Sequence, residues 1–420
     1  MDFEDSPAEA AFRIEVRTWL ARNAEPAAAD DAEALSVFSE AKGEEAAMDE
    51  ARRAQRKLAE DGWAAPVWPP AFGGRGCSLA ELMIWAEEKS RYRLPVGVFE
   101  IGLAMCGPTL MAHGTDAQRE RYLAPLLRGD EIWCQLWSEP GAGSDLAALS
   151  SRAERTDDGD WLLNGQKVWT SGAHYAQFGL GVFRTDPDAP KHHGITCLIV
   201  DMSAPGVEVR PLRQMTGDAH FNEVFFTDAR VPAGNVVGEV NGGWAVARTL
   251  MMFERAAVGG MTSPSRAVQP LLRLARRVPR GAGVAADDAI VRQCLAELYT
   301  LGRLFDLTTA RVRTALSKGG MPGTESSILK LAAAQLGTRA AESGLEVLGA
   351  AGVLTGADGA EGGRWVEALL GAPALHIGGG TDAIQRNIIG EQVLGLPREP
   401  AVDRDVAFRD LGKAMGGAAR

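Results

Sequence analysis

The stretch Trp133–Ala147, WCQLWSEPGAGSDLA, holds the residue types from which a loop for a flat or phosphate-bearing ligand is built. Its first residues are bulky and apolar, which suits a strand on a half-buried pleated surface. The glycines of the following GAGSD segment let the backbone approach a ligand closely and direct its amides at it. Ser138 and Ser144 add hydroxyl groups that donate or accept hydrogen bonds. A bare GAG is also typical of a simple turn between strands, and that alternative stays open for the motif taken alone.

A second stretch, Asn164–Ser171, reads NGQKVWTS. Its Asn-Gly dipeptide favours a tight hairpin turn between two short strands. Taken alone, Trp169 is most simply a strand tryptophan that fills the core of a β domain. The alternative is a ring that covers a flat cofactor, because aromatic rings pack well against planar groups.

Glu254 is the carboxylate with the most unusual surroundings. One helix is predicted from about residue 243 to residue 258, with Asn241 as its cap. An apolar stripe at helical spacing runs along this helix through Trp244, Ala247, Met251 and Val258. Glu254 lies on the same stripe, where a carboxylate is costly unless it is paired or functional. Two hypotheses follow: a structural ion pair with Arg255, or a catalytic base whose pKa is raised by desolvation.

These stretches, together with the glycine-rich segment IGGGTDAIQR at residues 377–386, closely resemble the signatures of the acyl-CoA dehydrogenases. The resemblance covers about Ser6 to Pro397. It is densest in five segments, namely Gln135–Asp145, Asn164–Ser171, Gln214–Pro232, Gly243–Arg255 and Gly378–Pro397.

The resemblance implies an FAD cofactor and assigns residues to it. Trp169 would pack against the isoalloxazine, and Ser171 would hydrogen-bond near N5, the atom that accepts hydride. The glycines that lead into Thr381 would form a helix start suited to a phosphate. The other implied cofactor contacts are Gln135, Leu136, Trp137, Ser138, Gly143, Ser144, Thr170, Glu346, Gly349 and Asp382.

The resemblance also implies a catalytic base. In several family members the base occupies the Glu-before-Arg position, which is Glu254 here. The family's other base position falls on Gly379, and this departure favours Glu254 because the reaction still needs a carboxylate. The backbone N–H of Gly379 keeps an oxyanion-hole role that requires no side chain. Substrate contacts are implied for Ser144, Met251, Arg255 and Gly380.

Two further departures concern the subunit contact across which relatives often complete the flavin site. The family's Arg-x-x-Phe element has no clean counterpart between Ser263 and Ala285, and Glu346 occupies the position of a glutamine. A glutamate near a pyrophosphate is repulsive. Glu346 is therefore expected either to turn away or to leave the site to be completed by a different partner chain.

The surrounding elements predict a mainly α-helical fold with a small β-barrel domain. Ser6 with Glu9, and Ser78 with Glu81, have the spacing of helix caps. We expect an N-terminal helical domain over residues 1–130, a middle β-barrel domain over 131–240 and a C-terminal four-helix bundle over 241–397. The polar, glycine-rich residues 398–420 favour a flexible tail. This order is also the order of the acyl-CoA dehydrogenase fold.

The composition of the 420 residues, 46% hydrophobic and 24% charged, is typical of a globular enzyme. A net charge of −11 argues against nucleic acid and anionic lipid as partners. The five cysteines are scattered without a CxxC pair, which indicates buried thiols in a reducing compartment and neither disulfides nor a metal site. The N-terminus lacks a secretory pattern and no apolar run could span a bilayer, so a cytoplasmic protein without membrane insertion is expected.

The sequence therefore predicts an FAD-dependent acyl-CoA dehydrogenase that converts an acyl-CoA thioester to the trans-2-enoyl-CoA. Its expected partners are electron-transfer flavoprotein or a similar acceptor, and further subunits in a homo- or hetero-tetramer. One alternative is a partly or non-catalytic subunit of a hetero-oligomer, which Glu346 and Ala383 favour. A second alternative is a flavin monooxygenase or oxidase on the same fold. Glu254 opposes both alternatives.

Overall fold

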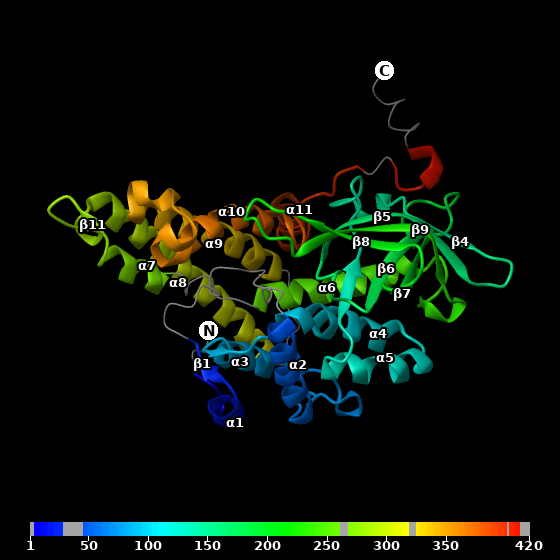
Figure 1. Cartoon of the computed structure of the whole chain (residues 1–420), viewed down its shortest axis with the longest axis horizontal. Coiled ribbons are helices and arrows are strands. Elements are labelled where there is room, and N and C mark those ends of the chain that lie inside the picture. The colour runs from blue at the N-terminus through cyan, green and yellow to red at the C-terminus, as the bar shows by residue number, and fades with distance from the viewer. Residues whose placement is uncertain (1–3, 28–44, 261–267, 319–324, 401–402, 412–420) are drawn as a thin grey trace, which may run out of the picture. The chain divides into compact units, whose positions relative to one another are not determined.

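Figure 1 shows the computed structural model of the chain, which describes residues 4–27, 45–260, 268–318, 325–400 and 403–411. The chain forms two compact units, each assembled from separated segments. The helical unit comprises residues 1–39, 78–94 and 255–397, whereas the sheet unit comprises residues 40–77, 95–254 and 398–420. Among the described residues, no helix is long and apolar enough to cross a membrane.

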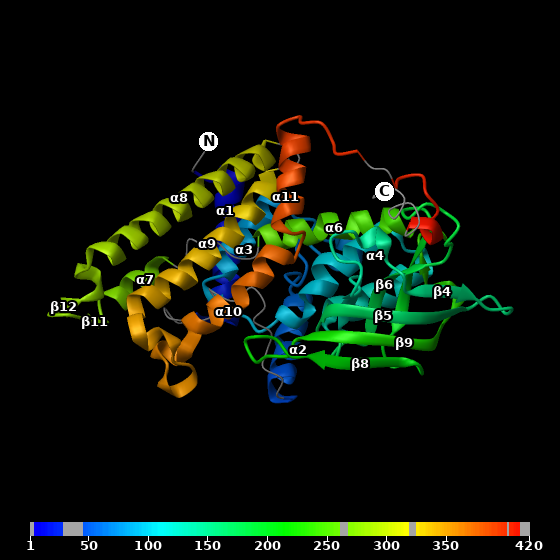
Figure 2. The same cartoon turned by 90° about the horizontal axis from the view of Figure 1, so that it is seen from above.

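The helical unit brings the start of the chain to helices that come much later. Helix α1 (Pro7–Asn23) packs on α3 (Leu79–Lys89), which in turn contacts α8 (Ala289–Ser317). Helices α8, α9 (Glu325–Leu348) and α10 (Arg364–Ile377) run beside one another (Figure 2). The unit is completed by β1 (Glu25–Pro26), β2 (Tyr92–Arg93), α7 (Val268–Ala275), β11 (Pro279–Arg280), β12 (Gly283–Val284) and α11 (Asp382–Ile388).

Local signals fix the starts of two of these helices as the sequence predicts. The N–H of Ser6 donates to Glu9 Oε2 at 2.8 Å, and the N–H of Glu9 donates back to Ser6 Oγ at 3.3 Å. Ser78 and Glu81 form the same reciprocal capping box at the start of α3. Both predicted caps are confirmed, because a capping box needs only residues three positions apart.

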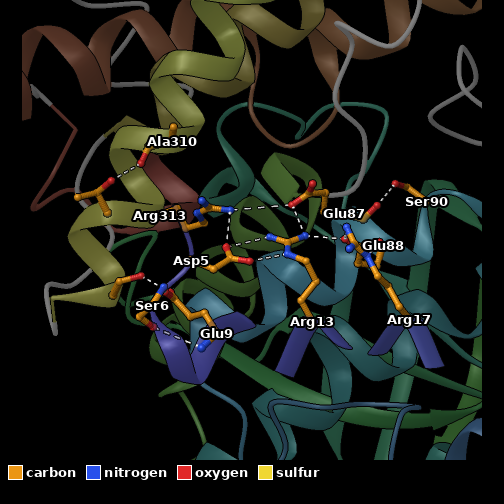
Figure 3. Close-up of polar contacts among 12 residues, drawn as sticks. Asp5, Ser6, Glu9, Arg13, Arg17, Glu87, Glu88, Ser90, Ala310 and Arg313 are labelled. Atoms are coloured by element: carbon orange, nitrogen blue, oxygen red, sulfur yellow. Dashed lines mark hydrogen bonds and ion pairs between the residues drawn. The ribbon is translucent and has the colours of Figure 1, made fainter. Parts of the chain in front are cut away.

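A cluster of charges joins α1, α3 and α8 (Figure 3). The carboxylate of Glu88 is 1% exposed and lies 2.6 Å from Arg13 Nη1 and 2.9 Å from Arg17 Nη2. Arg13 also pairs with Asp5 at 2.6 Å, and Arg313 of α8 lies 3.6 Å from the same Asp5. Burial opposes ionisation of Glu88, but hydrogen bonds from Arg17 and Arg13 outweigh it and lower the pKa of Glu88. This cluster therefore holds the first helix to the bundle through charge.

The sheet unit contains the helices α2 (Glu45–Glu60), α4 (Gly107–His113) and α5 (Asp116–Arg128), and the first part of α6 (Gly243–Gly260). Gln55 of α2 is fully buried, and its Nε2 donates to the carbonyl of Leu127 at 2.7 Å. Trp68 is also buried and donates from Nε1 to Leu103 O at 3.0 Å. A Cβ at Gly107 would lie 2.2 Å from the Trp68 ring, so only glycine fits at this point of α4.

The sheet of this unit is open, which corrects the predicted barrel. Its strand order is β10-β7-β6-β4-β5-β9-β8, and β3 pairs in parallel with β6. In the described part of the chain, the end strands β10 and β8 do not pair with each other. Alternating strands predict a sheet, but they do not determine whether its edges meet. The strands are β3 (Trp133–Leu136), β4 (Arg152–Arg155), β5 (Trp161–Ser171), β6 (Phe178–Arg184), β7 (Ile195–Asp201), β8 (Val207–Leu212), β9 (Phe221–Val231) and β10 (Val236–Val237).

The predicted hairpin at Asn164-Gly165 is also wrong, because β5 continues through this dipeptide. The register between β5 and β9 shifts between Leu163 and Gly165, which marks a β-bulge. Gly165 has φ 143°, and a Cβ there would lie 2.3 Å from Ser151 Oγ. The glycine therefore allows a close approach of Ser151, the residue before β4, and does not form a turn.

The end of the chain contacts the sheet unit, although its composition favours a flexible tail. Residues 403–411 include Asp403, whose carboxylate lies 2.6 Å from Lys191 Nζ. The N–H of Phe408 donates to Ala189 O at 2.9 Å, and Arg184 stacks over the Phe408 ring at 4.0 Å. Residues 403–411 therefore make specific contacts with the sheet unit. Residues 412–420 lie outside the described residues, and the flexible tail stays a prediction.

Candidate functional site

The first glycine loop, residues 138–145, follows β3 and rests on a buried ion pair. Glu139 N and O exchange hydrogen bonds with Ala142 O and N at 3.0 Å, which closes the turn. The Glu139 carboxylate accepts from the N–H groups of Ser150 at 2.6 Å and Ser151 at 3.0 Å. Lys167 of β5 is fully buried and donates from Nζ to Glu139 Oε1 at 2.8 Å. The buried ion pair of Glu139 and Lys167 thus holds the first glycine loop in place.

The two charges of this pair respond differently to burial. Burial disfavours the anion of Glu139, but the charge and hydrogen bond of Lys167 and the bonds from Ser150 and Ser151 together lower its pKa. For Lys167, burial is the largest effect and lowers the pKa of the ammonium, against the attraction of Glu139. Lys167 also donates to Trp137 O at 3.1 Å and to Val182 O at 2.7 Å. Lys167 therefore connects the loop to strands β5 and β6.

The upper side of the first glycine loop is open to a ligand. Gly141, Gly143 and Ser144 are exposed, and a Cβ at either glycine would meet nothing within 4 Å. Gln135 is half-buried in β3, while Leu136 and Trp137 are buried. Ser138 is half-buried and accepts from Val168 N at 2.9 Å, so the loop lies directly beside the second predicted stretch.

Trp169 is the clearest outlier of the sheet unit. It has φ 60°, a left-handed conformation that is rare for bulky residues and costs about 1–2 kcal/mol. Its side chain is 57% exposed, so the hypothesis of a core tryptophan is wrong. The register of β5 against β9 shifts between Lys167 and Thr170, and the resulting bulge turns Trp169 outward. Phe221 supports the ring edge-on, with centroids 5.8 Å apart.

Two buried polar atoms next to this surface have no partner among the described residues. These atoms are Trp137 Nε1 and Thr170 Oγ1. Buried donors are normally satisfied, so an orphaned pair beside an exposed ring and an open glycine loop needs an explanation. A flat cofactor rich in hydrogen-bonding groups fits the aromatic face, the free space and the polar atoms. Ser171, the last residue of β5, is half-buried beside them.

Glu254 lies on α6 (Gly243–Gly260), on the side of the helix that faces inward. Val246, Ala247 and Leu250 of this helix are buried, and Glu254 is half-buried one turn after Leu250. Met251 is half-buried as well. Asn241 does not act as the predicted cap in the bonds that the structure shows, since its Oδ1 accepts from Thr185 Oγ1 at 2.5 Å. The side chain of Arg255 lies outside the described residues, so the ion-pair hypothesis stays a prediction.

The second glycine loop, residues 378–381, connects α10 to α11 in the helical unit. Gly379 and Gly380 adopt φ of 65° and 90°, and both are half-buried. Thr381 caps α11 by accepting from Ile384 N at 3.3 Å. The Asp382 carboxylate lies 2.7 Å from His376 Nδ1 and 3.6 Å from Lys330 Nζ, and is therefore directed into its own unit.

Glu346 is neutralised within the chain. Its carboxylate lies 3.0 Å from Arg280 Nη2, and its carbonyl accepts from Arg280 Nη1 at 3.0 Å. Gly349, with φ 57°, follows one turn later. A cavity of about 230 Å³ beside Glu346 is lined by α8 and α9. Arg280 lies between Ser263 and Ala285, where the sequence shows no Arg-x-x-Phe element. Its guanidinium balances the negative charge of Glu346.

Sequence reasoning missed three residues that support these loops: Glu139, Lys167 and Lys191. Lys191 joins Asp145 at 2.8 Å and Asp403 at 2.6 Å, and so ties the first glycine loop to the end of the chain. Glu139 and Lys167 lie inside the recognised stretches, but their pairing is a long-range contact that no spacing indicates. The predicted site residues are divided between the two units. The first glycine loop, the end of β5 and Glu254 belong to the sheet unit, whereas Arg255, Glu346, Gly349 and residues 379–382 belong to the helical unit.

Comparisons with known proteins agree with this architecture. Three domains described for acyl-CoA dehydrogenases match the chain: the N-terminal domain over residues 6–130, the middle domain over residues 134–229 and the C-terminal domain over residues 241–394. The chain therefore belongs to the acyl-CoA dehydrogenase family and is an oxidoreductase, as the sequence predicts.

One relative and two solved structures match this chain over nearly their whole length. Acyl-CoA dehydrogenase IpdE1 of Mycolicibacterium smegmatis is 40% identical over 402 residues, which are 92% of this chain and 98% of the relative. The ChsE4-ChsE5 complex from Mycobacterium tuberculosis matches with a TM-score of 0.79 and 30% identity, over 95% of this chain and 100% of the other. The Tcur3481-Tcur3483 steroid ACAD matches with a TM-score of 0.80 and 29% identity, again over 95% and 100%.

Proposed function

We propose that the chain binds FAD in the sheet unit, between the first glycine loop and the Trp169 bulge. The observation that carries this proposal is Trp169, held exposed in a strained left-handed conformation. Such strain persists where the surroundings enforce it and clusters at ligand sites. Trp137, Ser138, Gly143, Ser144, Thr170 and Ser171 would complete the contacts. FAD, when bound, supplies the acceptor for the β hydrogen and the two electrons.

Glu254 takes the α proton of the acyl-CoA thioester in this proposal. Its place at the end of the buried face of α6 supports the assignment, because partial desolvation favours a carboxylate that accepts a proton. The N–H of Gly379 would stabilise the negative charge that develops on the thioester oxygen. Glu254 and Gly379 belong to different compact units, so their meeting in one site rests on the family resemblance. The product is the trans-2-enoyl-CoA.

The substrate is proposed to carry a bulky or ring-bearing acyl group. Gly379 lacks the side chain that many relatives carry at this position, and its φ of 65° favours glycine. The missing carboxylate leaves room beside the α carbon. The structural neighbour described as a steroid ACAD supports a ring-bearing acyl chain.

The proposed assembly is an oligomer that contains a second type of subunit. The neighbour from Mycobacterium tuberculosis is described as a complex of two named chains, and the other neighbour also carries two names. Glu346, with its charge matched by Arg280, departs from the family's glutamine at the position that relatives use across subunits. We propose cytoplasmic localisation and electron-transfer flavoprotein, or a similar carrier, as the electron acceptor.

The test replaces the proposed base by its neutral isostere. Glu254→Gln should keep bound flavin and thioester but slow flavin reduction by about 10²–10⁴-fold, as for loss of a general base. Flavin is measured by its visible bands and identified after denaturation, and reduction is followed by stopped flow. Suitable probes are octanoyl-CoA, 2-methylbutanoyl-CoA and 3-cyclohexylpropanoyl-CoA.

The matched control is Glu239→Gln, which removes the same charge from an exposed residue of the same unit. It should leave the reduction rate unchanged. A Glu254→Gln protein that reduces flavin as fast as the wild type would remove Glu254 from its role. A colourless protein that takes up no FAD, alone or with a partner chain, would overturn the enzyme function itself. Fastest turnover of octanoyl-CoA would contradict only the bulky-substrate proposal.

A further inference from the structure

Gln385 of α11 is fully buried and is directed at the second glycine loop. Its Nε2 donates to Gly379 O at 2.9 Å and to Gly380 O at 3.3 Å. Its backbone N–H donates to Thr381 O at 2.9 Å. One residue therefore contacts the carbonyls of three successive loop residues, although it lies in the helix that follows the loop.

These bonds orient the peptide groups of the loop. A trans peptide fixes its C=O and N–H in opposite directions. When Gln385 holds the carbonyl of Gly379, the peptide plane between Gly379 and Gly380 is fixed. At the other end, the N–H of Gly378 donates to Ala374 O at 2.8 Å, which fixes the plane before Gly378. The peptide that carries the N–H of Gly379 lies between these two fixed planes.

The N–H groups of the restrained loop remain available to a ligand. Among the described residues, the N–H groups of Gly379 and Gly380 donate no hydrogen bond. Without anchors, glycines at φ 65° and 90° would populate many other conformations, because glycine is the most permissive residue. A Cβ at Gly380 would lie 2.8 Å from Gln385 Nε2, so the amide packs tightly against the loop. Gln385 therefore restrains the middle of the loop, while Gly378 and Thr381 hold its two ends.

We propose that Gln385 is a positioning residue that aims the N–H of Gly379 at the thioester oxygen. The proposal rests on the role assigned to Gly379 in the proposed function. Gln385 acts through the loop and touches neither the substrate nor the flavin in this account. Its effect is on transition-state stabilisation, because a preorganised donor costs no rearrangement during the reaction.

The chemistry of the site requires a donor at this position. Two carbonyl oxygens face the side-chain end of Gln385, and an amide nitrogen supplies two N–H groups. A carboxylate would place oxygen against oxygen, and an apolar side chain would leave both carbonyls without this donor. The Oε1 of Gln385 is buried and has no partner among the described residues, so the amide does not gain from the opposite orientation.

The experiment compares Gln385→Met with Gln55→Met in the full-length holoprotein. Gln55 is a matched control, since it is also fully buried, donates from Nε2 to a backbone carbonyl at 2.7 Å and has an unpartnered Oε1. Both variants lose a buried amide of the same size. Gln385→Asn is the second test variant if Gln385→Met does not fold, because it keeps the amide but withdraws it by one methylene.

Three readouts separate positioning from stability. Hydrogen exchange at residues 377–384 is measured without ligand, and Gln385→Met should accelerate it about tenfold or more. Infrared spectra of the best-binding probe thioester, labelled with ¹³C at the carbonyl, should show a smaller shift to low frequency than in the wild type. The kcat should fall about 10–100-fold with little change in KM, which is less than full loss of an oxyanion donor. Gln55→Met should change none of these values.

The outcomes distinguish this inference from the proposed function. The positioning role is wrong if residues 377–384 of Gln385→Met exchange their amide hydrogens at the wild-type rate and the thioester carbonyl is polarised as in the wild type. If Gln55→Met lowers kcat equally, the effect is one of general stability and the inference also fails. If Glu254→Gln reduces flavin normally, or if no probe thioester reduces the wild type, the proposed function fails, whatever the Gln385 variants do.

Discussion

The two glycine loops of this protein are held in place by opposite means. Beneath the first loop, residues 138–145, lies the buried ion pair of Glu139 and Lys167, with an Nζ to Oε1 distance of 2.8 Å. Behind the second loop, residues 378–381, lies the neutral amide of Gln385. In both supports, a side chain from a neighbouring element donates to backbone carbonyls: Lys167 of β5 at the first loop and Gln385 of α11 at the second.

This difference predicts how each loop responds when its support is removed. A buried ion pair is costly to break, because removal of one partner leaves an uncompensated charge in the interior. A buried amide makes weaker bonds, and its loss leaves only unsatisfied carbonyls. Loss of the ion pair should therefore disrupt the first loop and destabilise its unit at the same time. Loss of the Gln385 amide should change the conformation of the second loop before it lowers the free energy of unfolding.

The largest effect should follow from breaking the ion pair. Lys167→Met leaves Glu139 buried without its cation and should lower the free energy of unfolding by about 3–5 kcal/mol, with loss of flavin. Chemical denaturation and the flavin content of the purified protein measure this. Lys167→Met/Glu139→Gln should regain most of the stability, because neither position of the pair then carries a charge. A double variant as unstable as the single one would contradict this account.

A smaller effect should come from low pH, which distinguishes the titrating ion pair of the first loop from the neutral amide of the second. The pKa of Glu139 lies below its ordinary value of 4.5, so its contribution to stability is present above pH 4.5 and is lost as the pH falls through the folded value. Gln385 does not titrate. The stability difference between the wild type and Lys167→Met/Glu139→Gln should therefore shrink below pH 4.5. Urea titrations at several pH values would show a constant difference if the pair plays no such part.

Trp169 offers a smaller effect that separates the ring from the backbone. Trp169→Gly relieves the left-handed strain, whereas Trp169→Ala retains it, so the glycine variant should be more stable by about 1 kcal/mol. Both variants should bind flavin equally weakly, because both lack the ring. Thermal unfolding and flavin titration measure the two effects. Equal stability of the two variants would mean that φ 60° carries no strain here.

The smallest effect should come from the end of the chain. Asp403→Asn removes one of the two carboxylates on Lys191 and should cost less than about 1 kcal/mol, because Asp145 still pairs with Lys191. Limited proteolysis should then cut near residues 403–411 more readily, with flavin retained. Lys191→Met also frees Asp145 of the first loop and should weaken flavin binding. Identical flavin affinity in both variants would show that this link does not reach the loop.

Local patterns allowed parts of the fold and site to be predicted. The caps at Ser6 and Ser78 need only neighbours three residues away, and the helical and strand segments follow from periodicity. The exposure of Trp169 follows from the resemblance, but its positive φ does not, since nothing in a tryptophan indicates this conformation. The hairpin at Asn164 was wrong because the same dipeptide also fits a bulge that another strand approaches.

Long-range contacts could not be predicted. Lys167 reaches Glu139 across the sheet, Arg280 reaches Glu346 of α9, and Asp403 reaches Lys191. Each of these pairs joins residues whose separation in the chain has no fixed relation to their separation in space. The open edge of the sheet is a similar case, because strand composition does not determine which edges pair.

The interleaved segments of the two units have a consequence for synthesis. The chain leaves the ribosome from its N-terminus. The charge cluster of helix α1 can therefore form completely only after Arg313 of α8 has been synthesised. In the same way, the contacts of the sheet unit with residues 403–411 form only after those residues have been synthesised. Neither unit corresponds to one continuous fragment that could be expressed alone. Each unit can therefore be completed only after all of its segments have been synthesised.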